Sequence, residues 1–135
     1  MSLEQGLYEL VQGDSTVASL ASTGGYFGTL PKGTGLPSWA YTTVARQGTY
    51  TLGGKDGLVC KRLQIDCFGR GDPALGPADA VQLATAITNV LDDFRGTLPN
   101  NVQVQWIQQI GEHDFFDTGA RSYRRALEFY IWYAS

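Results

Sequence analysis

The chain has 135 residues, of which 43% are hydrophobic and 17% charged, and this length predicts one domain spanning residues 1–135. A domain of this size buries enough apolar surface to fold without a metal or a disulfide. Ten Lys and Arg against 13 Asp and Glu give a net charge of -3, which argues against nucleic-acid binding through phosphate contacts. No apolar run approaches the roughly 18 residues that span a membrane, and no secretion signal follows Met1, so we expect a soluble protein made in the cytoplasm.

The first part of the chain combines helical and irregular patterns. Apolar residues recur at helical spacing from Ser2 to Gln12, and a second short helical turn is expected over Thr16–Ala21. The next segment, Ser22–Ser38, holds five glycines and two prolines, a composition typical of a long loop. A brief extended piece at Tyr26–Phe27 is the only regular structure that we expect there.

Two strands follow this loop. Ser38–Arg46 is rich in aromatic and β-branched residues, as strands are, and Leu58–Gly69 alternates in polarity, as half-solvated antiparallel strands do. The segment between them, Gln47–Gly57, is too long for a tight turn, and we interpret it as a projecting arm. Its four glycines and few apolar side chains predict that the arm is poorly ordered in an isolated subunit.

The second half of the chain predicts one long helix and two further strands. The helix begins at Pro77, ends near Arg95 and carries an apolar stripe. Its opposite face is polar and is expected to point away from the sheet, with Asp79, Gln82, Thr85, Asn89 and Asp92. Gly96 supplies a C-terminal cap, and strands are expected over Val102–Ile110 and Arg121–Ala134. The predicted fold is therefore α+β, an antiparallel four-stranded sheet with helices packed on one face, in the order α-β-β-α-β-β with a projecting loop between the first two strands.

The two cysteines, Cys60 and Cys67, are predicted to be inert thiols. They lie seven residues apart in one strand, which puts them on opposite faces and too far apart for a disulfide. No second Cys or His pair exists to suggest a zinc site.

Three motifs carry possible chemistry, and each has a simpler interpretation. Gly28–Thr34 has the glycine spacing of a phosphate-binding loop, but Thr34 occupies the position where that loop needs Lys. The Glu112–Asp117 segment places the only histidine, His113, among three carboxylates, which could bind a cation or transfer protons; as an expected surface connection, it is better explained as solvated charge. Arg70-Gly-Asp72 is interpreted as a turn before Pro73. No catalytic residue, metal site or cofactor is predicted.

Aromatic residues on the outward face of the last strand point to a protein contact. Tyr130 and Trp132, with Trp39 or its neighbours, would leave an apolar surface after helices have covered the other face of the sheet. Two alternatives remain open at this point. One is a plain dimer that buries Tyr130 and Trp132 across a two-fold axis; the other is a small enzyme or ligand-binding domain that uses the Gly-rich loop and the Glu112–Asp117 segment.

Four segments together resemble the tail completion, or tail terminator, proteins of long-tailed bacteriophages and prophages. They are Tyr26 with Pro31 and Leu36–Tyr41, Tyr50–Gly54 leading to Arg62–Phe68, Leu91–Gly96 at the end of the long helix, and Tyr123–Tyr133. The similarity covers nearly the whole chain. The resemblance implies a non-catalytic structural protein of the virion that is present in the host cytoplasm during assembly.

The resemblance also implies an assembly. It implies a ring, usually a hexamer, that closes the head-proximal end of the tail tube and joins the tail to the head connector while DNA passes through the lumen. In such a ring the arm could reach a neighbouring subunit. The candidate interface residues are Tyr50, Leu52, Lys55, Leu58, Tyr130 and Trp132.

Overall fold

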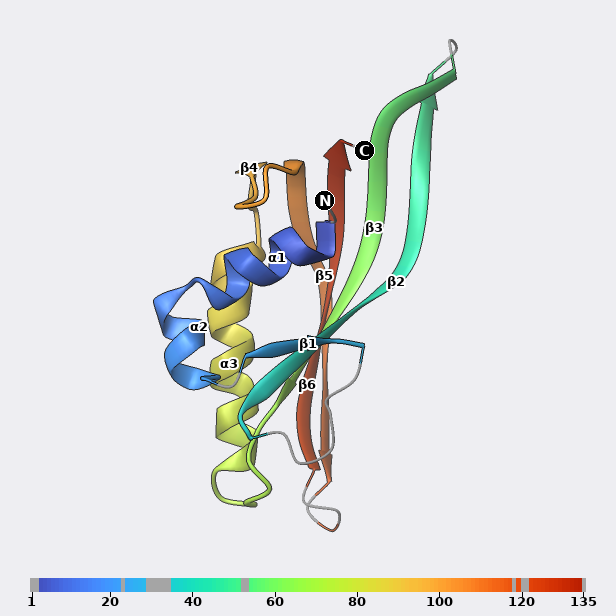
Figure 1. Cartoon of the computed structure of the whole chain (residues 1–135). Helices are drawn as coiled ribbons and strands as arrows, with labels where there is room; N and C mark the ends of the chain where they lie inside the picture. The colour runs from blue at the N-terminus through green and yellow to red at the C-terminus, as the bar shows by residue number, and fades with distance from the viewer. Residues whose placement is uncertain are drawn as a thin grey trace.

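A computed structural model describes residues 3–22, 24–28, 35–51, 54–117, 119 and 122–134, with residues 45, 47–51 and 54–58 described by their backbone alone. In chain order the elements are α1 (Leu3–Gln12), α2 (Ser15–Leu20), β1 (Gly25–Phe27), β2 (Ser38–Thr51), β3 (Gly54–Phe68), α3 (Gly76–Leu91), β4 (Gly96–Thr97), β5 (Gln103–Asp117) and β6 (Ser122–Ala134) (Figure 1).

The strands form one mixed six-stranded sheet in the order β1-β2-β3-β6-β5-β4, curved into a half-barrel. β1 pairs with β2 in parallel, and the other pairs are antiparallel. The predicted antiparallel four-stranded sheet with helices packed on one face is therefore wrong. The two additional strands have only three and two residues, too few to produce a periodic pattern. Gly96, expected to cap the long helix, instead begins β4.

The segment between the first two strands projects, but the prediction that it is a loop is wrong, because β2 and β3 continue through it and pair with each other as far as Thr51 and Gly54. The glycine content suggested a loop, but cross-strand backbone pairing overrides that composition. β6 ends at Ala134 opposite Leu58, so the part of β2 after Gly48 and the part of β3 before Leu58 extend past the end of β6. We call residues 48–57 the β2–β3 hairpin; Figure 1 shows that it projects beyond the rest of the sheet.

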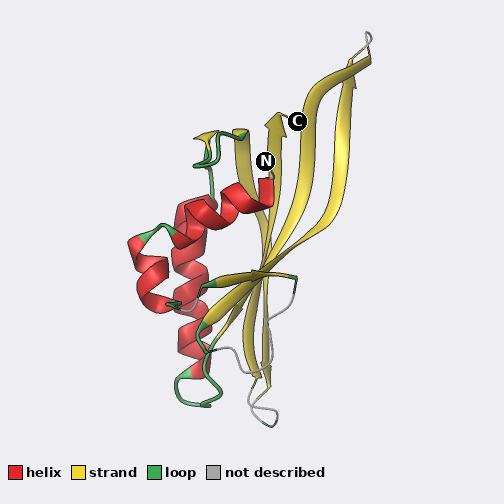
Figure 2. Ribbon diagram, viewed as in Figure 1, coloured by secondary structure: helices red, strands yellow, loops and turns green. Residues whose placement is uncertain are grey.

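The core lies between the helices and the sheet, and Figure 2 shows the three helices grouped together. Each helix contributes an apolar stripe, as the helical spacing predicts. The largest fully buried side chains include Leu83, Ile87 and Leu91 from α3 and Leu63, Ile65, Leu127, Phe129 and Ile131 from the sheet. Polar contacts fix α1 over the sheet, because Glu4 Oε1 accepts hydrogen bonds from Lys61 Nζ at 2.5 Å and Thr43 Oγ1 at 2.9 Å.

The long helix is shorter than predicted. It ends at Leu91 because Asp92 has an extended backbone, and Asp93 adopts a positive φ of 62°. Asp79, expected on the exposed polar face, is only 8% exposed, so that part of the prediction is wrong.

Both cysteines are free and buried in β3. Burial raises the pKa of the Cys67 thiol far above its ordinary value, which keeps it in the unreactive protonated form. In the part of the chain that the structure describes, no helix has both the length and the apolar character needed to cross a bilayer.

Candidate functional site

The face of the central strands opposite the core presents polar and aromatic side chains. We call it the outer face and define it by Arg62, Gln64 and Asp66 of β3 and Arg124, Glu128, Tyr130 and Trp132 of β6. These residues alternate with the buried residues Leu63, Ile65, Leu127 and Phe129, because successive side chains of a strand point to opposite faces.

The charges of the outer face are paired across the two strands. The Arg62 guanidinium donates to Glu128 Oε2 at 2.7 Å, and the Arg124 Nε lies 3.9 Å from Asp66 Oδ1. Gln64 Nε2 donates to Asp66 Oδ1 at 3.2 Å. The result is a surface of alternating, mutually compensated charges.

Tyr130 and Trp132 form an aromatic pair on this face. Their ring centroids lie 6.4 Å apart at 57°, and Tyr130 is 36% exposed. Trp132 is half-buried. Aromatic pairs that reach the surface in this way are typical of protein contact surfaces. The prediction that Trp39 shares this surface is wrong: Trp39 is 1% exposed, and its indole Nε1 donates to Gln12 Oε1 at 3.0 Å inside the fold.

The four candidates in the arm belong to the β2–β3 hairpin or its base. The backbone of Tyr50 pairs with that of Lys55, and that of Leu58 pairs with Ala134 of β6. Leu52 and the side chains of Tyr50, Lys55 and Leu58 lie outside the described residues.

A second apolar surface, at the turn-proximal end of β5 and β6, is absent from the sequence predictions. Phe115 and Phe116 are 49% and 41% exposed, and the Arg124 guanidinium lies 4.3 Å from the Phe115 ring centroid. With Phe68 and Asp117 they line a cavity of about 490 Å³. Two consecutive phenylalanines are the sequence signal for this surface, but the carboxylates around them indicate a solvent-exposed connection instead.

The Glu112–Asp117 segment, expected as a surface connection, lies within strand β5, so that prediction is wrong. Asp114 accepts hydrogen bonds from Arg125 Nε at 2.6 Å and NH2 at 3.0 Å, and these bonds lower the pKa of Asp114. Glu112 lies 3.5 Å from the same guanidinium. Alternation puts His113 on the other face from these carboxylates. Among the described residues, no three His, Cys, Asp or Glu side chains gather in a way that could hold a metal ion.

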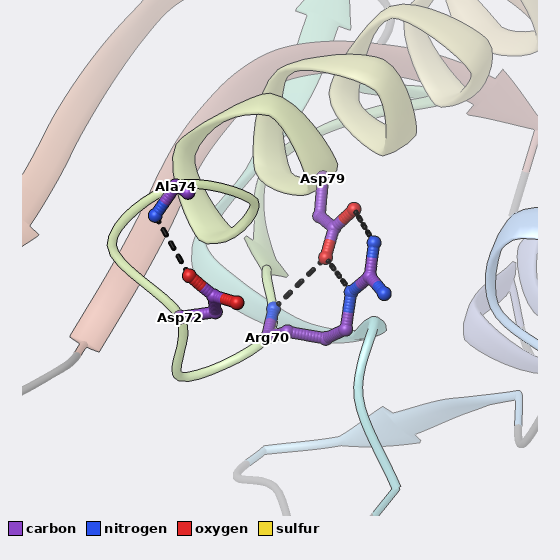
Figure 3. A network of polar contacts seen from close by, with 4 residues as sticks. All are labelled: Arg70, Asp72, Ala74 and Asp79. Carbon is purple, nitrogen blue, oxygen red and sulfur yellow. Dashed lines mark hydrogen bonds and ion pairs between the residues drawn. The ribbon is translucent and has the colours of Figure 1, made fainter.

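The Arg70-Gly-Asp72 tripeptide is folded into the connection before α3 (Figure 3). The Arg70 guanidinium donates to Asp79 at 2.6 Å and 3.0 Å, and the Arg70 backbone N–H donates at 3.2 Å. The Asp72 carboxylate accepts from the Ala74 N–H at 2.8 Å. The Arg70 hydrogen bonds lower the pKa of Asp79. Both charged side chains of the tripeptide therefore form hydrogen bonds at or just before the first turn of α3.

Comparison with known proteins adds a family and a fold. A family model described as "Tail completion protein gp17" matches residues 5–134. No curated protein matches the chain. A chain from a solved structure described as "Virion of native gene transfer agent (GTA) particle" shares the fold with a TM-score of 0.72; it is 15% identical, and the match covers 99% of this chain and 96% of that one.

Proposed function

Because the chain belongs to the tail completion protein family, a family of structural phage tail proteins, we propose that it forms a ring that caps the head-proximal end of the tail tube and joins the tail to the head connector. The observation that carries this proposal is the family match over nearly the whole chain. As a structural phage tail protein the chain is a component of the virion particle, and we assign it to the head–tail junction. Family membership argues against an enzymatic function.

A ring subunit needs two different contact surfaces, one for each neighbour. We propose the projecting β2–β3 hairpin and the aromatic pair of the outer face as two such surfaces, because they lie on different parts of the molecule. We therefore keep Tyr50, Leu52, Lys55, Leu58, Tyr130 and Trp132 as the proposed interface residues, in a ring of six copies.

The proposed partners are the tail tube protein on one side of the ring and the connector or stopper protein on the other. DNA would pass through the lumen without specific binding. The net charge of -3 supports this role, since a negatively charged wall repels phosphate and lets the duplex slide.

A gene deletion in the encoding phage tests this function. Without the chain, we expect filled heads and separate tails, because nothing closes the tube or joins it to the connector. Expression of the wild-type chain in trans should restore joined particles, as should a Thr85→Ala variant altered at an exposed position of α3. A Tyr130→Ala, Trp132→Ala double variant should not restore them. Normal joined particles in the deletion strain would refute the proposal.

A further inference from the structure

Two long stretches of strand edge have no pairing partner among the described residues. β1 covers β2 only at Trp39–Tyr41, with the Gly28 N–H bound to the Tyr41 carbonyl at 2.8 Å, which leaves residues 42–51 open. At the opposite edge of the sheet, β4 and residues 92–94 cover β5 as far as Gln109, which leaves the edge of residues 111–117 open. Open edges of this length are templates for pairing with another strand.

A bulge lies at or close to the start of the open part on each of these strands. In β2 the register shifts between Thr43 and Ala45, and in β5 between Gln109 and Gly111. A bulge bends its strand and increases the twist. The open segments therefore diverge from the elements that cover the rest of the same strands, which leaves room for a partner.

We propose that the open edge of β2 in one copy pairs with the open edge of β5 in the next copy, so that one sheet continues around the assembly. This inference rests on the proposed ring. The two edges are different and lie at opposite ends of the strand order, so the contact is head-to-tail. Head-to-tail contacts close into a ring when the rotation between copies fits.

The topology fixes the direction of this pairing. β2, β3, β6 and β5 alternate in direction, so β5 of one copy and β2 of the next run antiparallel where the sheet continues. This is the more favourable of the two pairing arrangements.

The register also gives the tilt of the strands. Glu112, in the open part of β5, is aligned through Leu127 and Ile65 with Tyr41. Tyr41 is about five residues, or about 17 Å, from Arg46 in the open part of β2. Four strands span about 19 Å, so a closed ring that pairs Arg46 with Glu112 requires a strand tilt of about 40° to its axis, within the range of β-barrels.

Charges on the two edges are complementary. Arg46 is exposed and lies opposite Lys61, so the two side chains are on the same face of the sheet. Arg46 forms no ion pair with any described residue. Glu112 is on the corresponding face of β5, and its side chain is 52% exposed. Because Arg125 is already bound by Asp114 through two hydrogen bonds, Glu112 retains capacity for a second cation. A register that keeps these faces together places Arg46 of one copy opposite Glu112 of the next.

The same charges disfavour a two-fold dimer. Pairing of two β5 edges would bring Glu112 and Asp114 of one copy against those of the other, and like charges directly opposite each other are destabilising. The charge pattern therefore selects the β2–β5 contact, which propagates around a ring.

Charge reversal tests this contact in particles. Arg46→Glu and Glu112→Arg should each lower the yield of joined particles at least about tenfold, because each places like charges across the contact. The double variant should restore most of the yield. Glu9→Arg, an equal charge change on the exposed side of α1, is the matched control and should leave the yield unchanged. Single reversals that assemble normally, or a double variant that is not restored, would overturn the pairing.

Cross-linking separates the failure of this inference from the failure of the proposed function. In particles carrying Arg46→Cys with Glu112→Cys, oxidation should give a ladder of cross-linked copies that ends at the copy number of the ring, whereas either single substitution should give none. Cys60 and Cys67 are buried and should not contribute. Joined particles without a ladder, or with a dimer band alone, would overturn the pairing and leave the ring in place. Joined particles that lack the chain would overturn the proposed function itself.

Discussion

Shortening the β2–β3 hairpin should remove an assembly surface without unfolding the chain. Deletion of residues 49–55 joins Gly48 to Asp56 and leaves Asp56, Gly57 and Leu58 between the paired positions Gly48 and Val59. A three-residue connection that contains glycine is a common hairpin turn. The deletion therefore preserves the register of β2 and β3 below the hairpin.

The expected change in the free energy of unfolding is small. The deletion removes two paired positions, Tyr50↔Lys55 and Thr51↔Gly54, and leaves the β3–β6 ladder intact from Leu58 onward. The lost backbone pairing is offset in part because the variant has about seven fewer residues that lose conformational entropy on folding. We expect the stability to stay within about 1 kcal/mol of wild type.

Urea denaturation and particle assembly are the two assays for this deletion. The variant should unfold at nearly the wild-type urea concentration and yet fail to complete tails. A deletion variant that yields joined particles of normal length would show that the hairpin is not a subunit contact. A variant that is unfolded in buffer would show that the hairpin belongs to the core of the sheet.

Three further substitutions test the fold and its electrostatics. Phe129→Ala empties a fully buried site in β6 and should lower the free energy of unfolding by about 3 to 5 kcal/mol in urea denaturation, with Phe129→Leu losing clearly less. Gly25→Ala should destabilise by about 1 to 3 kcal/mol, since a Cβ there would contact the Trp39 ring; Gly111→Ala, where the nearest atom is 4.0 Å away, is the control and should change little. The folded chain lowers the pKa of Asp79 below its ordinary value of 3.8, so the ionised carboxylate stabilises the fold above that pH, and the contribution is lost as pH falls through the folded pKa. Asp79→Asn should therefore weaken the acid dependence of the melting temperature; an unchanged acid profile would contradict the Arg70–Asp79 contact.

Long periodic segments of the sequence located the main elements, whereas short elements and sheet pairing could not be read from it. The alternation of Leu63 and Ile65 and the helical spacing of Leu83 and Ile87 arise from burial, which leaves a pattern in the sequence. β1 and β4 leave none, because backbone pairing to a neighbouring strand defines them. The pairing of β2 with β3 along the hairpin depends on the same kind of backbone contact, so the sequence predicts a projecting arm there but not its strand pairing.

The candidate surfaces were predictable only where side-chain type marks them. Tyr130 and Trp132 stand out as aromatics on an alternating strand, and the structure places them together. Trp39 carries the same signal but lies in the core, because only the tertiary fold brings Gln12 within reach of its indole. The open edges of β2 and β5 depend on strand order, which a single sequence does not specify.

Electron cryo-microscopy of the joined particles is the most direct measurement of the central claim. We predict that this fold occupies a ring between the last layer of the tail tube and the head connector, with its sheets continuous from one copy to the next. Density for the chain elsewhere in the particle, or a head–tail junction built without it, would contradict the account.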